Sequence, residues 1–345
     1  MSISQREARR LLALADDLAP AIRAAFIDAI NAKAATLNVS AVEAALRSAI
    51  QTGNSDELFR ILQFNQQSLF PLTEAVRGTY IAGMQAAGAG LPIRIQANFG
   101  FGGNPRAVAA VQRITGDLIT NVEHSQRDMT KALVAEVVNT GIPVRTMALD
   151  IVGRKNAEGV REGGYIGLDA PRATQAAKVA GMLRDKDAIA DYFIGGKPRY
   201  TTTDRRFDPM VRRAISEGRA LTAAEADKIT RHHLARLLKN RALTISRTES
   251  LNALRAGQMD GYRALVDSGT IAESRIERSW LATADDRTRH DHRMMNGQKV
   301  RGLSEPFTFP DRSQSLYPGD ASLFAPAKNL ILCRCVQTIT LRKRT

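Results

Sequence analysis

Two cysteines near the carboxyl end of the chain are the residues best suited to hold a metal ion. Cys333 and Cys335 stand one residue apart and are the only cysteines in the sequence. A disulfide between them would close a very small, strained ring, whereas their thiolates suit Zn²⁺. His290 and His292 lie upstream in a polar turn and could complete a set of four ligands. Two interpretations therefore stay open: a zinc site, or cysteines that are small buried apolar residues with histidines that are surface groups.

The polar turn that contains the histidines could also support catalysis. Residues 285–292 read DDRTRHDH, and the carboxylates could hold Mg²⁺ for phosphodiester cleavage. No nucleophile, base and orienting group can be recognised together, so the sequence does not indicate an enzyme. We instead expect Asp286 and Arg287 to form a structural ion pair that caps the turn.

Three polar residues, Arg247-Thr248-Glu249, lie in the middle of a predicted helix. They could contact a partner molecule. The interpretation that we favour is internal: Arg247 or Glu249 reaches the small domain that follows and holds it on the helix. Trp280, the only tryptophan, is expected in the core of that domain because of its large apolar area.

Nine basic residues in the middle of the chain could form a surface for nucleic acid or for a protein partner. Few aromatic residues accompany them, so stacking of single-stranded bases is not indicated, and sequence-independent contact with the backbone of double-stranded DNA is the better interpretation. The alternative is an ordinary solvated helical face. The nine residues are Arg199, Arg205, Arg206, Arg212, Arg213, Arg231, Arg236, Lys239 and Arg241.

The formal net charge of +14 is unevenly distributed. Residues 1–150 contain 14 basic and 13 acidic side chains, whereas residues 151–345 contain 35 basic and 22 acidic ones. Such asymmetry points to a polyanionic partner, either nucleic acid or an acidic protein surface. We recognise no signal peptide and no apolar run of about 18 residues, so we expect synthesis in a reducing cytoplasm and no membrane partner.

The elements that must position these residues are mainly helical. Apolar residues recur every three or four positions, and a glycine-rich segment at 88–104 interrupts them as a loop or as a short strand at 93–101. Pro105 begins a long helix, which Gly141-Ile142-Pro143 ends. The other helices expected in this half are 5–32, 40–51, 55–64 and 69–87.

The second half begins with a glycine-rich basic linker at 153–168. Helices follow from Pro171 and from Asp208-Pro209. A capping box of Thr222 and Glu225 then opens a long helical run to about Asp267, with a hinge or break expected near Asn240. β-branched or alternating segments predict short strands at 275–282, 306–309 and 336–341.

We thus expect a mainly α protein with three regions. An elongated helical N-terminal region covers 1–150, and a basic, likewise elongated helical middle region covers 151–268. A small C-terminal α+β domain covers 269–345.

The last third also contains a series of motifs in a distinctive order. It reads TISRTESLNALRA at 244–256, SWLATADDRTRHDHRMMNGQKV at 279–300 and SLYPGDASLFAPAKNLILCRC at 315–335. This order resembles the phage Mu F-like head morphogenesis family, in which R-T-E precedes W-x-x-T-x-D-x-R-T-R-x-x-H, then N/D-G-Q, Y-P-G-D and C-R-C. REGGYIGL at 161–168 and DRRFDPMVRRAI at 204–215 also match, so the resemblance covers about residues 140–345.

Two positions depart from the family pattern. The family usually has Asn before the first cysteine of C-R-C, and this chain has Leu332, which puts one turn or hydrogen bond in question. Other branches of the family carry C-x-x-C at the positions of Arg289 and His292, which with C-x-C would supply four sulfur ligands. Arg289 has no free lone pair to offer a metal, so His290 or Asp286 would have to take its place.

The resemblance implies a minor head protein of a tailed phage, present in few copies and associated with the portal protein. Its partners would be the portal, inner capsid or scaffold proteins and double-stranded DNA. It would occupy the virion, in the head interior or portal region, and the host cytoplasm during assembly. One alternative is a DNA-binding protein ejected with the genome, and another is a metal-dependent nuclease. Salt-dependent DNA retention and a cleavage assay would separate the three.

Overall fold

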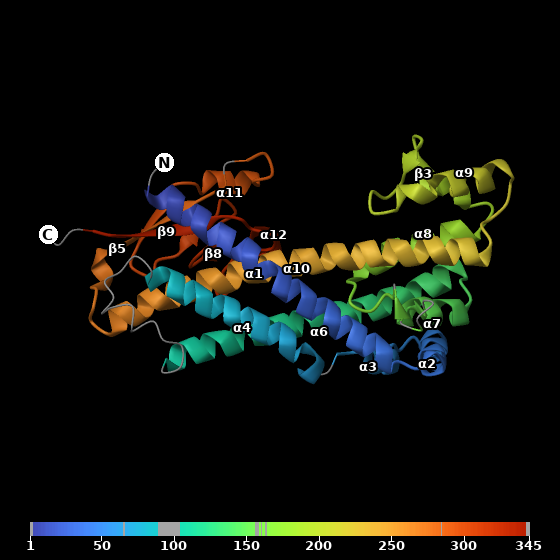
Figure 1. Cartoon of the computed structure of the whole chain (residues 1–345), viewed down its shortest axis with the longest axis horizontal. Helices are drawn as coiled ribbons and strands as arrows, with labels where there is room; N and C mark the ends of the chain where they lie inside the picture. The colour runs from blue at the N-terminus through green and yellow to red at the C-terminus, as the bar shows by residue number, and fades with distance from the viewer. Residues whose placement is uncertain are drawn as a thin grey trace. The chain divides into compact units, whose positions relative to one another are not determined.

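The computed structural model describes residues 3–64, 66–88, 104–155, 159, 161, 162, 164–283 and 285–342 (Figure 1). Within these residues the chain is mostly helical and its strands are short, with the longest of them near the carboxyl end. The prediction of a mainly α chain ending in a small α+β domain is confirmed. The loop or strand expected at 93–101 lies outside the described residues, as does part of the linker at 153–168.

The first half of the chain forms the expected helices with small shifts at their ends. Asn38 and Asn104 act as caps, each accepting hydrogen bonds from two backbone amides at the start of the following helix. A short helix after Pro143 was not predicted. The helices are α1 (Ile3–Thr36), α2 (Val39–Thr52), α3 (Asp56–Leu62), α4 (Gln66–Gly88), α6 (Pro105–Thr140) and α7 (Val144–Val152).

The middle of the chain combines helices with two small hairpins. Strands β1 and β2 pair antiparallel, and so do β3 and β4. The elements in order are β1 (Arg154–Lys155), β2 (Arg161–Glu162), α8 (Ala170–Arg184), β3 (Phe193–Ile194), β4 (Lys197–Pro198), α9 (Asp208–Ser216) and α10 (Ala223–Asp267).

Helix α10 begins at the capping box that the sequence predicts. The Thr222 amide donates to the Glu225 carboxylate at 2.9 Å, and the Glu225 amide donates to the Thr222 hydroxyl at 3.3 Å. The helix continues for 45 residues without a break at Asn240, so the expected break is wrong, whereas a hinge at this position stays a prediction. Buried Arg241 and Ala242 pack this stretch into the interior, which holds it helical.

The small carboxy-terminal domain is built on a three-stranded antiparallel sheet in the order β6-β5-β9. Trp280, Phe307 and Phe309 form its core together with both cysteines. Its elements are β5 (Ile276–Leu281), α11 (His290–Met294), β6 (Lys299–Arg301), β7 (Phe307–Thr308), β8 (Gln314–Ser315), α12 (Ala327–Leu330) and β9 (Val336–Leu341).

Packing divides the chain into two compact units, each assembled from separate stretches of sequence. Unit 1 contains Met1–Ala25, Pro71–Asp117 and Leu243–Thr345, and unit 2 contains Phe26–Phe70 and Leu118–Ala242. The division into regions 1–150, 151–268 and 269–345 stays a prediction. No described helix has the length and apolarity needed to cross a bilayer.

In unit 1, α4 and α10 cross at the distance of backbone contact. A Cβ atom on Gly83 would lie 2.2 Å from the Leu254 carbonyl oxygen, and one on Gly257 would lie 2.1 Å from the Tyr80 carbonyl oxygen. Only glycine fits at such an approach. The Tyr80 hydroxyl, which donates to Asp260 at 2.7 Å, closes the same crossing.

In unit 2, a charged network connects α7, α8 and α10. Asp150 is 3% exposed and accepts hydrogen bonds from Arg154 and Arg184, and both arginines also pair with Asp227. Each buried charge therefore has an opposite charge beside it, as buried ions require. The network fixes the region that leads into the basic middle of the chain.

Candidate metal centre and the cavity beside it

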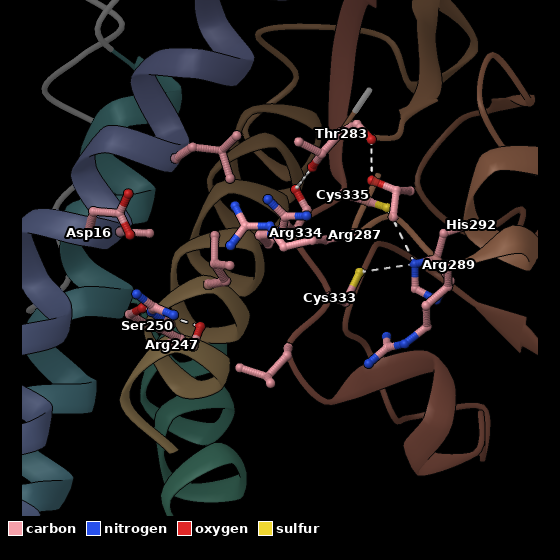
Figure 2. A pocket seen from close by; sticks show the side chains of 15 residues that line it. Asp16, Arg247, Ser250, Thr283, Arg287, Arg289, His292, Cys333, Arg334 and Cys335 are labelled. Carbon is pink, nitrogen blue, oxygen red and sulfur yellow. Dashed lines mark hydrogen bonds between the residues drawn. The ribbon is translucent and has the colours of Figure 1, made fainter. Parts of the chain in front are cut away.

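The structure brings His292, Cys333 and Cys335 together in the core of the small domain. His292 lies on α11, and the cysteines lie in the segment between α12 and β9. The His292 Nδ1 atom is 3.5 Å from the Cys333 sulfur and 3.3 Å from the Cys335 sulfur, and Figure 2 shows both sulfurs directed at this one nitrogen. All three residues are buried, and their ligand atoms lie within 4.8 Å of one another.

These distances suit a tetrahedral metal ion. With Zn–S of about 2.3 Å and Zn–N of about 2.0 Å, sulfur and nitrogen ligands of one zinc ion lie about 3.5 Å apart. Two soft sulfurs and one imidazole are also the donors that zinc prefers. The three residues therefore fit a zinc ion in both chemistry and spacing.

The expected fourth ligand is not part of this cluster. His290 is exposed at the first residue of α11. Residues two apart on a helix point to nearly opposite sides, so His290 and His292 cannot both face the sulfurs while α11 is helical. Asp286 is exposed as well. Of the four residues predicted to bind metal, three meet and His290 does not.

A buried arginine on α10 is hydrogen-bonded to the backbone of the cysteine segment. Arg255 on α10 is 0% exposed and donates hydrogen bonds to the backbone carbonyls of Cys333 and Cys335. The pKa of Cys333 is lowered because the Cys335 thiol donates a hydrogen bond to it, and His292 and the Arg255 cation act in the same direction. A thiol that ionises easily is a better metal ligand.

The cluster lines one wall of a cavity of about 450 Å³. Figure 2 shows Asp16 and Arg247 on the side formed by α1 and α10, with Arg287, Arg289 and Arg334 on the side of the small domain. The cavity is therefore rich in guanidinium groups. Its lining residues are Leu12, Ala15, Asp16, Arg247, Ser250, Leu251, Thr283, Arg287, Thr288, Arg289, His292, Leu332, Cys333, Arg334 and Cys335.

The three residues of the R-T-E motif have different surroundings. Thr248 holds the small domain on the helix, because its hydroxyl accepts a hydrogen bond from the Leu332 amide at 3.1 Å. Arg247 is exposed and lines the cavity. Burial raises the pKa of Glu249 to about 7, and the Asp117 carboxylate adds to this effect. The bridge between helix and domain that we expected from Arg247 or Glu249 is made by the residue between them.

The turn before α11 is closed by a different ion pair from the one that we expected. Asp285 accepts hydrogen bonds from two nitrogens of Arg334, at 2.6 and 2.7 Å, and one from the Thr288 hydroxyl at 3.0 Å. Arg287 lies 3.9 Å from the same Asp285 carboxylate. The described contacts contain no pair between Asp286 and Arg287.

The nine basic residues of the middle region fall into four groups. Arg241 is only 5% exposed and donates to the Gly167 carbonyl at 2.8 Å. The prediction that it belongs to a nucleic-acid or partner-binding surface is therefore wrong. Arg205, Arg206 and Arg236 lie beside Asp204 or Asp208. Arg199 and Arg212 donate to backbone carbonyls, whereas Arg213, Arg231 and Lys239 make no ion pair with a described residue.

Two buried arginines were missed in the sequence. Arg255 follows Leu251 by four residues and therefore shares its buried helix face. Arg278 alternates with Ile276 and Trp280 on the inner side of β5, and it donates to the carbonyls of Gly302, Glu305 and Leu316. In both cases the spacing from buried apolar neighbours predicts a buried side chain, whereas an arginine is usually expected at the surface.

Comparison with known proteins identifies the segment that contains this centre. Residues 206–338 match the family model described as Phage Mu protein F like protein. No curated protein and no solved structure matched the chain. The matched segment includes α9, α10 and nearly all of the small domain, and REGGYIGL at 161–168 lies outside it.

Proposed function

Because residues 206–338 match the phage Mu protein F-like family model, we propose that this chain is a minor head protein of a tailed phage. Its role is structural: it takes part in head morphogenesis by attaching to the portal protein and to inner capsid or scaffold proteins. Double-stranded DNA is a further contact. The protein resides in the head interior or portal region of the virion.

The proposal rests on the hydrogen bonds that the motif residues of this chain make. Thr248 bonds the Leu332 amide, Arg255 bonds the carbonyls of both cysteines, and Asp320 accepts from the Leu316 amide and both donors of Ser322. These groups build the small domain and fasten it to α10. In a catalytic site they would instead face a substrate. An attachment module is the function that such an arrangement supports best.

We also propose that His292, Cys333 and Cys335 bind Zn²⁺ as a structural ion. The ion would fix α11 against the cysteine segment. Such an ion adds stability to a small domain, because a small domain buries a smaller fraction of its surface on folding than a large one. The charge and chemistry of the three donors support this assignment.

Affinity capture of the portal protein tests the attachment. The full chain and the portal protein of the same phage are co-expressed, and the portal is captured at about 150 mM salt, where weak surface attraction between charges is screened. We expect the chain to be retained, and an unrelated protein of similar positive charge to be lost. If the chain is lost under the same conditions as the control, the portal part of the proposal is wrong.

The DNA contact has its own test. Arg213, Arg231 and Lys239 are free of ion pairs with described residues, so their combined change to Gln should weaken binding of a double-stranded fragment in a gel shift at about 50 mM salt. The matched control changes Arg9, Arg10 and Arg60, three exposed arginines outside the middle region. Absence of binding by the wild-type chain would remove DNA from the list of partners, and equal binding by both variants would show that these three residues do not form the contact.

A further inference from the structure

The three donors of the cysteine cluster are one ligand short of a closed zinc site. The His292 Nδ1 atom lies 3.5 and 3.3 Å from the sulfurs of Cys333 and Cys335, and among the described residues no further histidine, cysteine or carboxylate joins this group. Zinc sites with a purely structural role are almost always closed by four protein ligands, whereas sites that exchange a ligand have three. An ion held here would therefore need its fourth ligand from outside the group.

Oxygen atoms near the cluster are already committed to charged hydrogen bonds. The backbone carbonyls of Cys333 and Cys335 accept from the buried Arg255 guanidinium. The Asp285 carboxylate, in the turn before α11, accepts from two nitrogens of Arg334 at 2.6 and 2.7 Å. Moving any of these oxygens to a metal ion would leave a guanidinium without its partner, which costs free energy.

The cluster is bounded by the aromatic core on one side and by the cavity on another. The His292 ring lies against Trp280 and Phe309, with ring centroids 6.2 and 5.6 Å apart, and neither aromatic side chain offers a lone pair to a metal. All three donor residues also line the cavity of about 450 Å³. Figure 2 shows Asp16, the one carboxylate among the lining residues, well apart from both sulfurs. The cavity is therefore the side from which a ligand can approach the cluster.

We propose that His292, Cys333 and Cys335 hold zinc with an open fourth position, and that a small thiolate from solution occupies this position through the cavity. This inference rests on the zinc site proposed above, and the ion still joins α11 to the cysteine segment. An ion with two thiolates carries no net charge, so the surroundings decide which ligand is preferred. Four arginines and one carboxylate line the cavity, which favours an anionic ligand over a neutral one.

A thiolate is the anion that this centre should bind best. Thiolate is a soft ligand that suits zinc, and it matches the two sulfurs already present. The cavity also has apolar lining from Leu12, Leu251 and Leu332, which suits the short alkyl chain of a small thiol. The thiol loses its proton to the buffer as its sulfur binds, so no bond of the protein is broken.

The cobalt-substituted full chain tests the proposal, because charge-transfer absorption reports the thiolate ligands of Co²⁺. The protein is kept reduced with a phosphine, loaded with Co²⁺ and titrated with 2-mercaptoethanol. We expect saturable binding and a roughly 1.5-fold rise in this absorption, since three thiolate ligands replace two. X-ray absorption of the zinc-loaded protein should show the number of sulfur ligands increasing in the same proportion.

Two variants that each add one cysteine form a matched pair. Position 289 lines the cavity three residues before His292 and therefore on the same side of α11, whereas position 294 comes two residues after it and points to nearly the opposite side. Arg289→Cys should supply the fourth ligand from the chain, so its absorption should start at the three-thiolate level and ignore added thiol. Met294→Cys adds its thiol at an exposed position and should respond like wild type.

The outcomes separate this inference from the zinc proposal on which it rests. A chain that binds neither Zn²⁺ nor Co²⁺ overturns both. Bound cobalt whose absorption ignores the added thiol, or zinc whose number of sulfur ligands stays constant, overturns only the open position. Loss of the ion from the protein during the titration also overturns it, since the thiol then competes with the chain for the metal. The wild-type measurements decide by themselves if a variant does not fold.

Discussion

The Thr248 hydroxyl accepts a hydrogen bond from the Leu332 amide at 3.1 Å, and Leu332 adopts a left-handed backbone conformation with φ of 55°. This one contact joins α10 to the turn that carries the cysteines. A leucine is strained in that conformation, whereas asparagine adopts it more easily. The asparagine that the family usually has at this position is thus explained by the backbone, and the turn itself persists in this chain.

Leu332→Asn should therefore stabilise the protein. We expect a gain of roughly 0.5–1 kcal/mol in the free energy of unfolding, because the left-handed conformation costs asparagine less than leucine. Urea denaturation measures the change. The control is Ile331→Asn, an exposed neighbour with an ordinary φ of −64°, which should show no gain. Equal effects of both substitutions would mean that strain at Leu332 is unimportant.

Alanine at Gly83 or Gly257 should disrupt the crossing of α4 and α10. A Cβ there would lie 2.2 or 2.1 Å from a backbone oxygen, so the helices must separate, and we expect a loss of about 2 kcal/mol or more. Gly78 on α4 has open space around its Cβ position. Gly78→Ala should instead stabilise the helix by about 0.5–1 kcal/mol. Thermal unfolding measures both effects. Equal stabilities of the Gly83→Ala and Gly78→Ala variants would contradict the described packing.

Removal of zinc should lower the stability of the small domain. Protein purified without chelator should contain about one zinc per chain, and Co²⁺ exchanged into the site should show the intense absorption of thiolate ligation. Cys333→Ser should lose the metal, whereas His290→Ala should keep it because His290 lies outside the cluster. Less than about 0.2 zinc per folded chain would end the zinc assignment.

The stability of the protein should fall as the pH rises from about 4.5 to about 7. Burial raises the pKa of Glu249 to about 7 from an ordinary value of 4.5, so the folded state holds a proton that the unfolded state has already released in this window. Glu249→Gln removes this contribution and should flatten the profile of unfolding free energy against pH. A profile identical to that of wild type would show that Glu249 titrates normally.

Much of the fold could be predicted because local signals and tertiary packing agree. The proline at the start of α6, the Thr222–Glu225 box and the alternation in β5 each have a purely local cause. The helix α7 was missed because it has only nine residues and directly follows Gly141-Ile142-Pro143, which ends the preceding helix. Burial of its side chains within unit 2 stabilises this short helix.

The site was predicted only where residue type decides its chemistry. Cysteine and histidine are common metal ligands, so they could be selected from the sequence, and three of the four proposed ligands lie together in the structure. His290 could be set aside only once α11 was known to be helical. Arg255 supports the cysteines from 78 positions upstream of Cys333, and such a distant contact depends on the tertiary fold.

Mass spectrometry of purified virions, quantified against the portal protein, tests the central claim most directly. If the chain is a minor head protein, its peptides should be present at a few copies per portal ring and should stay with heads after tails are removed. Virions that contain the portal but no trace of this chain would contradict the account.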